Sequence, residues 1–277
     1  GTWVADGTSI ITKLTIADGA TVTYGSAKDA NGKAIKLEAG KTYENITVSD
    51  QPDETPAYTG LAQAEDGTWY YYLEGEIAYG ISGLAQNEYG WWYVENGKVD
   101  FTHNGLVQNQ YGWWYVQNGQ INFGYTGLVA NEYGWWRVEG GKINFNYTGL
   151  VANEYGWWYV EGGKINFNAN GLVANEYGWW YVQGGQINFN FNGIVPNEQG
   201  WWYVRNGMID FNFNGLAANE NGWWKFEGGK IDFNFNGAAQ NENGWWYVRG
   251  GKIDFSYNGT VKVGGKTYTV TGGKLNV

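Results

Sequence analysis

A single 22-residue unit repeats through most of the chain. One copy runs Gly149-Leu-Val-Ala-Asn-Glu-Tyr-Gly-Trp-Trp-Tyr-Val-Glu-Gly-Gly-Lys-Ile-Asn-Phe-Asn-Ala-Asn170. Its leading glycine recurs without interruption, at Gly83, Gly105, Gly127, Gly149, Gly171, Gly193, Gly215, Gly237 and Gly259. A fixed period of this size indicates an architecture in which each unit packs on its neighbours. Any function must therefore be one that uses many copies of the same unit.

Each unit carries the pattern of a β-hairpin. In the unit that begins at Gly83, Asn96-Gly97 separates two strand-like runs and suits a type I′ turn, which needs φ > 0 at both central positions. The register set by such a turn pairs Glu95 with Lys98, Val94 with Val99, Tyr93 with Asp100, and Trp92 with Phe101. This register predicts an apolar core face of Trp92, Val94, Val99 and Phe101. The opposite face carries Trp91, Tyr93, Glu95, Lys98 and Asp100.

A lone hairpin is marginally stable in water, so these apolar faces are expected to stack. The segment Gly-Leu-Val-Ala-Asn-Glu that joins successive hairpins is expected to add one or two apolar residues to the same core. Two all-β architectures fit: a solenoid of stacked hairpins, or a β-propeller with two hairpins per blade. A propeller predicts a 44-residue alternation of unit types, and the sequence shows none. The pattern favours the solenoid.

The flanking segments differ from the repeat. Residues 1–50 hold short alternating runs punctuated by glycine, which predict a small β-domain or the cap of an upstream one. Strands are expected at 14–16, 21–24, 34–37 and 45–48. Residues 51–57 contain two prolines and predict a linker. The array then occupies 58–277 in about ten units, with degenerate first and last units that act as caps.

The repeated phrase Gly-Trp-Trp-Tyr-Val-x-Gly-Gly-Lys-Ile-x-Phe after a Gly-Leu opening resembles the cell-wall-binding repeats of Gram-positive surface proteins. That superfamily includes choline-binding repeats, glucan-binding repeats and the C-terminal repeats of clostridial toxins. The resemblance covers about four-fifths of the chain, and it implies a hairpin solenoid with aromatic ligand sites between consecutive hairpins. In choline-binding members a Gly-Trp opening supplies one wall of each cage. Here that position holds Leu84, Leu106, Leu128, Leu150, Leu172, Ile194, Leu216, Ala238 or Thr260, which disfavours choline itself.

The candidate ligand-facing residues are aromatic. The first Trp of each pair and the Tyr two residues later are Trp91/Tyr93, Trp113/Tyr115, Trp157/Tyr159, Trp179/Tyr181, Trp201/Tyr203 and Trp245/Tyr247, with Arg137 after Trp135 and Lys225 after Trp223 in the two departing units. Beside them stand Tyr89, Tyr111, Tyr133, Tyr155 and Tyr177, replaced further on by Gln199, Asn221 and Asn243. A flat aromatic face suits the C–H face of a sugar or a quaternary ammonium group. The alternative is that both tryptophans only pack hairpin on hairpin.

Composition excludes several functions. The net charge of −10 without a basic patch argues against nucleic acid, and no apolar run approaches the roughly 20 residues of a membrane span. The absence of cysteine excludes thiolate metal sites. A repeated calcium site is disfavoured because Asn stands where a carboxylate is wanted, as at Asn122, Asn144, Asn166 and Asn188. His103 is the only histidine and occupies a position that is Tyr or Phe in other units.

No metal or cofactor is therefore expected, and no unique catalytic constellation stands out. The sequence predicts a non-enzymatic, extracellular module of the bacterial surface, a segment of a longer exported protein. Its leading role is attachment to a cell-wall polysaccharide or teichoic-acid-type polymer. The alternatives are binding of a dietary or host glucan and a structural spacer in an adhesin. Many weak sites on one array would bind a repetitive polymer with avidity.

Overall fold

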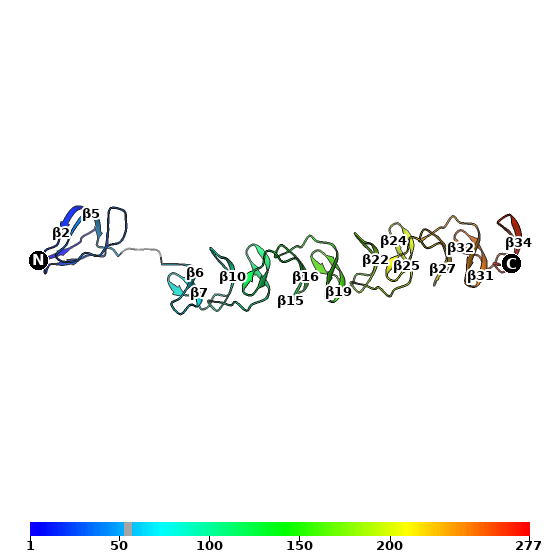
Figure 1. The fold of residues 1–277 in the computed structure, drawn as a ribbon, viewed down its shortest axis with the longest axis horizontal. Helices are drawn as coiled ribbons and strands as arrows, with labels where there is room; N and C mark the ends of the chain where they lie inside the picture. The colour runs from blue at the N-terminus through cyan, green and yellow to red at the C-terminus, as the bar shows by residue number, and fades with distance from the viewer. Residues whose placement is uncertain (53–56) are drawn as a thin grey trace. The chain divides into compact units, whose positions relative to one another are not determined.

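The computed structural model describes residues 1–52 and 57–277, and every regular element in those two ranges is a β-strand (Figure 1). The prediction of an all-β chain is confirmed. Within the same ranges, no helix has the length and apolar character needed to cross a membrane. Backbone contacts divide the chain into two units, Gly1–Asn87 with Val94–Val99, and Glu88–Tyr93 with Asp100–Val277. The predicted linker lies mostly outside the described residues, so the division into 1–50, 51–57 and 58–277 stays a prediction.

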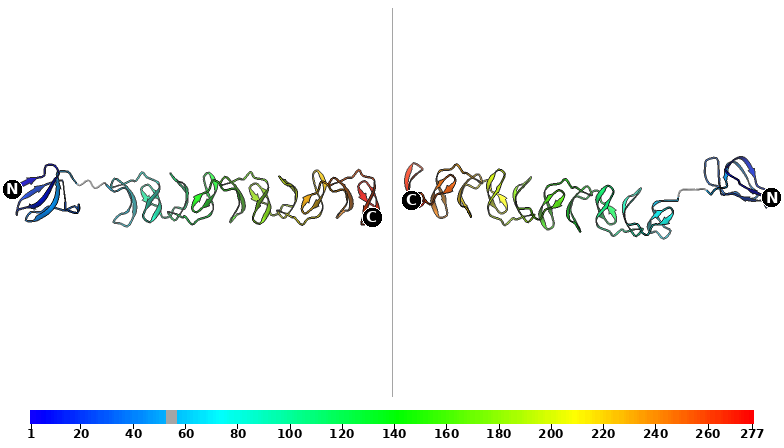
Figure 2. Two further views of the ribbon diagram at one scale, coloured as in Figure 1. Left: turned by 90° about the horizontal axis from the view of Figure 1, so that it is seen from above. Right: turned by 180° about the vertical axis from the view of Figure 1, so that it is seen from behind.

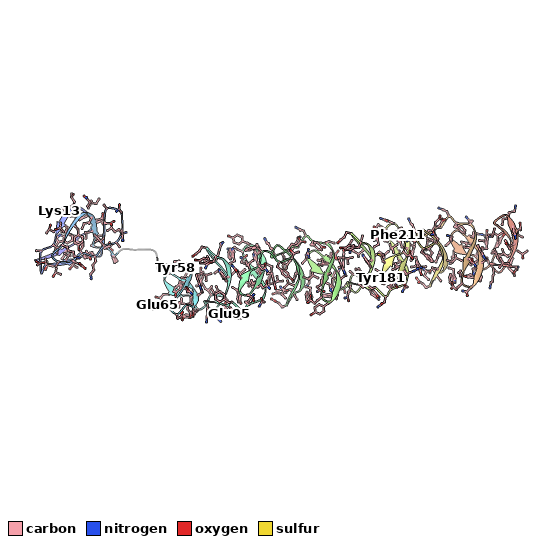
Figure 3. The ribbon with its side chains drawn as sticks, in the orientation of Figure 1. Lys13, Tyr58, Glu65, Glu95, Tyr181 and Phe211 are labelled. Carbon is pink, nitrogen blue, oxygen red and sulfur yellow. The ribbon has the colours of Figure 1, made fainter. Side chains whose placement is uncertain are left out.

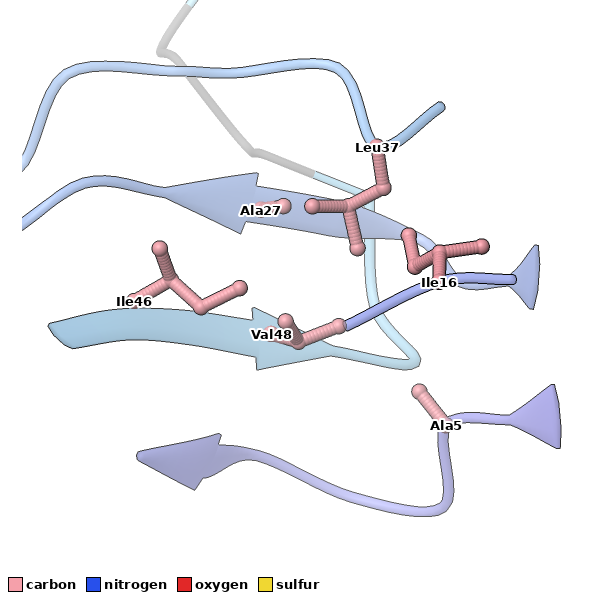
Figure 4. Packing of buried hydrophobic residues seen from close by; sticks show 6 residues of the cluster. All are labelled: Ala5, Ile16, Ala27, Leu37, Ile46 and Val48. Atoms are coloured by element: carbon pink, nitrogen blue, oxygen red, sulfur yellow. The ribbon is translucent and has the colours of Figure 1, made fainter. Parts of the chain in front are cut away.

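The first residues form two small sheets. Their strands are β1 (Thr2–Val4), β2 (Ser9–Thr15), β3 (Thr21–Thr23), β4 (Ser26–Lys28) and β5 (Thr42–Ser49). β1 pairs with β3 in parallel, and β5 lies between β2 and β4. Ile16, Ile46 and Val48 are central to a core of their own (Figure 4). The strand expected at 34–37 is wrong, because only an isolated bridge between Lys28 and Ala34 forms there.

Each unit of the array contains three strands. The first strands are β6 (Gly60–Gln63), β9 (Gly83–Asn87), β12 (Gly105–Asn109), β15 (Gly127–Asn131), β18 (Gly149–Asn153), β21 (Gly171–Asn175), β24 (Gly193–Asn197), β27 (Gly215–Asn219), β30 (Gly237–Asn241) and β33 (Gly259–Val263). The second strands are β7 (Trp69–Leu73), β10 (Gly90–Glu95), β13 (Gly112–Gln117), β16 (Gly134–Glu139), β19 (Gly156–Glu161), β22 (Gly178–Gln183), β25 (Gly200–Arg205), β28 (Gly222–Glu227), β31 (Gly244–Arg249) and β34 (Lys266–Thr271). The third strands have two residues each: β8 (Glu76–Ile77), β11 (Lys98–Val99), β14 (Gln120–Ile121), β17 (Lys142–Ile143), β20 (Lys164–Ile165), β23 (Gln186–Ile187), β26 (Met208–Ile209), β29 (Lys230–Ile231), β32 (Lys252–Ile253) and β35 (Lys274–Leu275).

The segment expected to be a connector is thus a strand, and it makes the longer hairpin of the unit. β18 pairs with β19 over five residue pairs, from Gly149↔Val160 to Asn153↔Gly156. β19 then pairs with β20 at Val160↔Ile165 and Glu161↔Lys164, which is the predicted hairpin. The second strand also reaches the next unit, where Trp158 pairs with Gln186 of β23.

Between Asp100 and Val277 this pairing passes from unit to unit along the chain, and the strands do not close into a barrel (Figure 2). Backbone hydrogen bonds also link consecutive units. For example, the N–H of Arg137 donates to the carbonyl of Gly163 one unit later (2.7 Å). The solenoid of hairpins is confirmed, and the propeller is not what forms.

The predicted turn and the two residue pairs beside it are also confirmed, whereas the predicted pair of Trp92 with Phe101 is wrong, because Trp92 pairs with Gln120 of the next unit. Asn96 and Gly97 both have positive φ (50° and 79°), as a type I′ turn requires. Val94 pairs with Val99 as expected. The valine of the second strand is the centre of most units, since Val94, Val116, Val138, Val160, Val182, Val204 and Val248 are fully buried; Phe226 takes this place in the unit that begins at Gly215.

The assignment of the Phe to the core face is wrong. Phe101 is 49% exposed, and the equivalent Phe145 and Phe167 are as open. The physical reason is that the third strand ends after two residues, at Val99 in this unit. The alternation of faces holds only within a strand, so it does not reach the Phe two residues further on.

Candidate ligand-binding grooves

An Asn of the first strand anchors the second Trp in seven units. In the unit that begins at Gly127, the Asn131 side-chain oxygen accepts hydrogen bonds from the indole Nε1 of Trp136 and from the backbone N–H of Tyr133, both at 2.9 Å. One carboxamide therefore holds the turn and fixes the ring. The same Asn–Trp bond, at 2.9–3.0 Å, recurs for Asn109–Trp114, Asn153–Trp158, Asn175–Trp180, Asn197–Trp202, Asn219–Trp224 and Asn241–Trp246.

The half-exposed Phe packs edge-on against this anchored Trp. The Trp136 and Phe145 ring centroids lie 5.6 Å apart with an interplanar angle of 75°. This T-shaped arrangement suits two aromatic quadrupoles. The remaining Trp–Phe pairs, at 5.4–5.6 Å, are Trp92/Phe101, Trp114/Phe123, Trp158/Phe167, Trp180/Phe189, Trp202/Phe211, Trp224/Phe233 and Trp246/Phe255.

The first Trp of each pair meets the following unit. Trp113 lies edge-on to Tyr133, with centroids 6.1 Å apart. The pairs Trp91/Tyr111, Trp135/Tyr155 and Trp157/Tyr177 repeat this contact at 6.0–6.3 Å. The structure thus brings together two of the predicted sets, the first tryptophans and the turn tyrosines, across the step between units. Tyr133 remains 59% exposed and can still meet a ligand.

The Tyr two residues after the first Trp has a different neighbour. Tyr115 packs against Tyr125 of its own unit at 4.1 Å. Tyr93/His103, Tyr181/Phe191, Tyr203/Phe213 and Tyr247/Tyr257 do the same at 3.7–3.9 Å. His103 therefore serves as an aromatic partner at a repeat position, as the sequence indicates. These tyrosines are partly buried, and desolvation is the main cause that raises the pKa of Tyr125 and of Tyr159.

The two units without this Tyr keep the contact with a cation instead. The Arg137 guanidinium lies 5.0 Å from the centroid of the Tyr147 ring, and the Lys225 ammonium lies 5.2 Å from that of Phe235. Stacking inside the unit, by a ring or by a cation, is therefore common at this position; Tyr159, whose partner position is Ala169, packs against a core cluster instead. The geometry places this position beside the core of the unit.

Grooves open between consecutive units next to the anchored Trp. One, of about 430 Å³, is lined by Gln108, Trp113, Asn131, Tyr133, Trp136, Ile143, Phe145 and Lys164. Its walls come from three successive units. A second, of about 300 Å³, is lined by Trp201, Asn219, Asn221, Trp224, Ile231, Phe233 and Lys252, and is the same groove four units later. A third, of about 510 Å³, lies beside Trp180, Phe189 and Phe211; Phe211 is one of the side chains labelled in Figure 3. We call these the Trp–Phe grooves.

A long side chain from the next unit lies over each anchored Trp. Lys164 Nζ is 5.3 Å from the Trp136 centroid. Equivalent lysines cover four other tryptophans at 5.1–5.5 Å: Lys142 over Trp114, Lys230 over Trp202, Lys252 over Trp224 and Lys274 over Trp246. Sequence reasoning missed the second Trp, the Phe, the Asn and this Lys as groove residues. Only their recurrence every 22 residues signals them, because the groove depends on which units touch.

The recurrent Asn or Asp of the third strand's end acts as a cap. Asn144 donates to Glu139 (2.7 Å) and accepts from the N–H of Asn146 (3.0 Å). That hydrogen bond from Asn144 is the main cause that lowers the pKa of Glu139. Four units have Asp at this position, and in two of them Arg stands in place of the Glu, as in the Arg205–Asp210 ion pair (3.4 Å). Within residues 1–52 and 57–277, no three His, Cys, Asp or Glu side chains gather as a metal site.

Comparison with known proteins identifies the repeat. The choline-binding repeat family matches nine segments: 57–72, 82–100, 102–122, 124–144, 146–166, 168–188, 190–210, 212–232 and 234–254. No curated protein matches the chain.

Three solved structures are similar to parts of the array. Alternansucrase in complex with isomaltononaose is 16% identical with a TM-score of 0.30, over 78% of this chain and 16% of that protein. CbpF in complex with ipratropium is 19% identical with a TM-score of 0.25, over 95% of this chain and 72% of CbpF. The pneumococcal cell wall endolysin of phage Cp-1, complexed with choline, is 16% identical with a TM-score of 0.22, over 66% of this chain and 48% of the endolysin. The chain thus spans only about a sixth of the length of alternansucrase.

Proposed function

The chain belongs to the choline-binding repeat family, and from that premise we propose that it is a non-catalytic module that attaches an exported bacterial protein to a cell-wall polymer. The observation that carries the proposal is the Trp–Phe groove, which recurs between units with aromatic walls and amide groups at its rim. Sugar-binding sites commonly combine flat apolar walls with a few convergent polar groups. A row of such grooves suits a ligand that is itself repetitive.

Within this proposal the first Trp of a pair and the turn Tyr of the next unit form the ligand-facing wall. Trp113 lines a groove together with Tyr133, and Trp201 lines one together with Asn221. The Tyr two residues after the first Trp holds the neighbouring core and shapes the wall from behind. We propose an extracellular location on the cell surface, consistent with this ligand class.

Avidity is the physical advantage of the array. Linked weak sites that engage one polymer raise its affinity by a factor on the order of 10²–10⁴ over one site. A catalytic centre needs one asymmetric set of groups with tuned pKa values. The array instead presents the same groups many times, which supports the assignment as a binding module.

The first prediction tests wall binding. We expect the full chain to be retained by isolated Gram-positive cell walls in a sedimentation assay. Replacement of the groove tryptophans in four consecutive units, Trp113→Ala, Trp135→Ala, Trp157→Ala and Trp179→Ala, should weaken retention at least about tenfold, because several linked sites are lost together. A Trp3→Ala variant is the control, since this half-exposed Trp lies outside the array.

The same assay separates the alternatives. Retention by an α-glucan such as dextran, without retention by walls, would favour the dietary or host glucan. No retention by either, for a chain whose near-ultraviolet circular dichroism shows intact aromatic packing, would leave only the spacer role.

A further inference from the structure

We propose that the ligand of the Trp–Phe grooves is an acidic glycan, in which sugar rings carry carboxylate groups as hexuronic acids do. The inference rests on the proposed function and specifies its substrate class. It assigns the choice of ligand to a set of groove lysines, defined as Lys142, Lys164, Lys230, Lys252 and Lys274.

The groove lysines have no carboxylate partner within 4.0 Å among the residues that the structure describes. This is unexpected in a chain with 27 acidic and 17 basic side chains. The sheet register even places Lys142 directly opposite Glu139, and Lys164 opposite Glu161. Each lysine instead extends to the preceding unit and lies over its anchored Trp. The positive charge is therefore presented in the groove and is not neutralised by the protein.

The stem of each groove lysine passes close to a glycine of the preceding unit. A Cβ atom added to Gly134 would lie 2.6 Å from the Cε of Lys164. The glycine that starts each second strand, with φ of +134° here, therefore leaves the space through which the lysine reaches. Gly112, Gly200 and Gly222 leave the same space for Lys142, Lys230 and Lys252, with distances of 2.5–2.7 Å.

The position of the ammonium selects among ligand charges. It already occupies the cation site on the electron-rich face of the Trp, so a quaternary ammonium ligand entering the groove meets a like charge. A neutral sugar gains the aromatic wall but leaves the ammonium unpaired. A sugar carboxylate gains both the wall and a charge-assisted hydrogen bond. Charges beyond about 10 Å are largely screened at 0.1 M salt, so the local lysine outweighs the net negative charge of the chain.

Amide groups complete the site. Asn131 and Asn219 line the two lysine-containing grooves, and their side-chain oxygens are occupied by the anchored Trp. Their NH₂ groups donate to none of the described residues. At the equivalent Asn109 and Asn197, the NH₂ group is buried without a partner in the described part of the chain. These groups are donors suited to the hydroxyl or carboxylate oxygens of a sugar.

Three second-strand tryptophans of the same array lack the lysine and serve as an internal contrast. Over Trp92 the position is Gln120, which donates to the Tyr89 carbonyl (3.0 Å). Over Trp158 the position is Gln186, which donates to the Tyr155 carbonyl (2.8 Å). Over Trp180 it is Met208, and the nearby Arg205 is already paired with Asp210. Glutamine at this position is thus compatible with the fold. A Lys→Gln substitution at a groove lysine therefore removes the positive charge and keeps the fold.

The second prediction is tested by isothermal titration calorimetry on the full chain, with oligogalacturonides as the acidic probe and their methyl esters as the neutral probe. A variant carries Lys142→Gln, Lys164→Gln, Lys230→Gln, Lys252→Gln and Lys274→Gln. A control carries the same charge change outside the grooves: Lys13→Gln, Lys28→Gln, Lys33→Gln, Lys36→Gln and Lys41→Gln. We expect the groove variant to lose at least about tenfold in affinity for the acid, because each lost pair is a charge-assisted hydrogen bond. The control variant should bind as the parent does, and the methyl ester should bind parent and groove variant alike and weakly.

Several results would overturn the inference. Equal affinity for acid and ester, or equal loss in the control variant, would show that the groove lysines do not read charge. Binding of a glycerol phosphate polymer without binding of the uronate would assign the lysines to phosphate. In each of these cases the wall-retention assay is unaffected, and the proposed function stands. Loss of wall retention itself would instead contradict the proposed function.

Discussion

Adjacent glycines of one turn have different tasks. Gly162 and Gly163 both have positive φ, at +57° and +79°. A Cβ on Gly162 would be 3.8 Å from its nearest neighbour, whereas on Gly163 it would be 2.5 Å from the Asn144 carbonyl oxygen of the preceding unit. The first glycine therefore supplies conformation only, and the second also permits close contact between units. Other units place Asn at the first position: Asn96, Asn118 and Asn206.

The third prediction follows from this difference. Gly162→Asn should change the free energy of unfolding by less than about 0.5 kcal/mol, because Asn tolerates the left-handed conformation. Gly163→Ala should cost roughly 2 kcal/mol or more, because backbone strain of about 1–3 kcal/mol adds to a clash with backbone. Urea unfolding followed by Trp fluorescence measures both. Equal costs for the two variants would mean that the contact between units is not tight at this turn.

Individual residues also show what the sequence could predict. The turn at Asn96-Gly97 and the buried pair of Val94 and Val99 were predictable, since both depend on contacts inside one hairpin. The exposure of Phe101 was not, because it depends on where the third strand ends. The anchor between Asn131 and Trp136 was not predictable for a related reason: it requires a strand where the sequence predicts a connector.

The first strand of one unit contains a proline, which shows which backbone N–H groups this strand does not need for pairing. Pro196 sits in β24 at the position next to the pair that flanks the turn. Pairs in an antiparallel ladder alternate between hydrogen-bonded and non-hydrogen-bonded, so the N–H at this position points away from β25. Proline is tolerated where no ladder bond is lost. The residue before it in each unit, such as Val151, faces the second strand as a hydrogen-bonded pair.

The fourth prediction compares two prolines in β18. Ala152→Pro should shift the midpoint of thermal unfolding only slightly, because Ala152 is the counterpart of Pro196. Val151→Pro should cost about 3 kcal/mol, since it removes a ladder bond to Trp158 and a buried side chain. A large loss from Ala152→Pro would mean that the N–H of this strand is needed by another unit.

At the scale of the element, two features of the first strand explain why the sequence predicts a connector in its place. Its turn, Asn-Glu-Tyr-Gly, lacks an adjacent Asn-Gly or Gly-Gly pair, which is the strongest short-range signal of a hairpin. Its strand residues, Gly-Leu-Val-Ala-Asn, include three with low β propensity. The strand forms because the Trp-Trp-Tyr-Val strand offers it an edge with backbone groups that are free to pair. Contacts with the neighbouring strand therefore determine that this segment is a strand. The candidate site depends on the same contacts, because they position the Asn, the turn Tyr and the groove.

At the scale of the array, contacts depend on neighbours and not on position in the chain. The second strand of one unit pairs with the third strand of the next, as in Trp136↔Lys164. Removal of Gly149–Asn170 would place Gly171 directly after Thr148 and Gln186 opposite Trp136. Every backbone pairing would be restored, because stability in such arrays is a sum of units and nearest-neighbour interfaces.

The fifth prediction is that this deletion leaves a folded array with changed binding. Deletion of the whole unit should preserve near-ultraviolet circular dichroism, whereas deletion of its first strand and turn, residues 149–155, should weaken it by leaving β19 without its partner β18. The whole-unit deletion also converts the Trp136 groove from a lysine-covered to a glutamine-covered groove, so four groove lysines remain of the five. Affinity for a long acidic polymer should fall more steeply than affinity for a short oligosaccharide, because linked binding events multiply and single ones do not. Equal losses of affinity for the two ligands would show that the units bind independently. The repeats would then extend the length of the array without adding avidity.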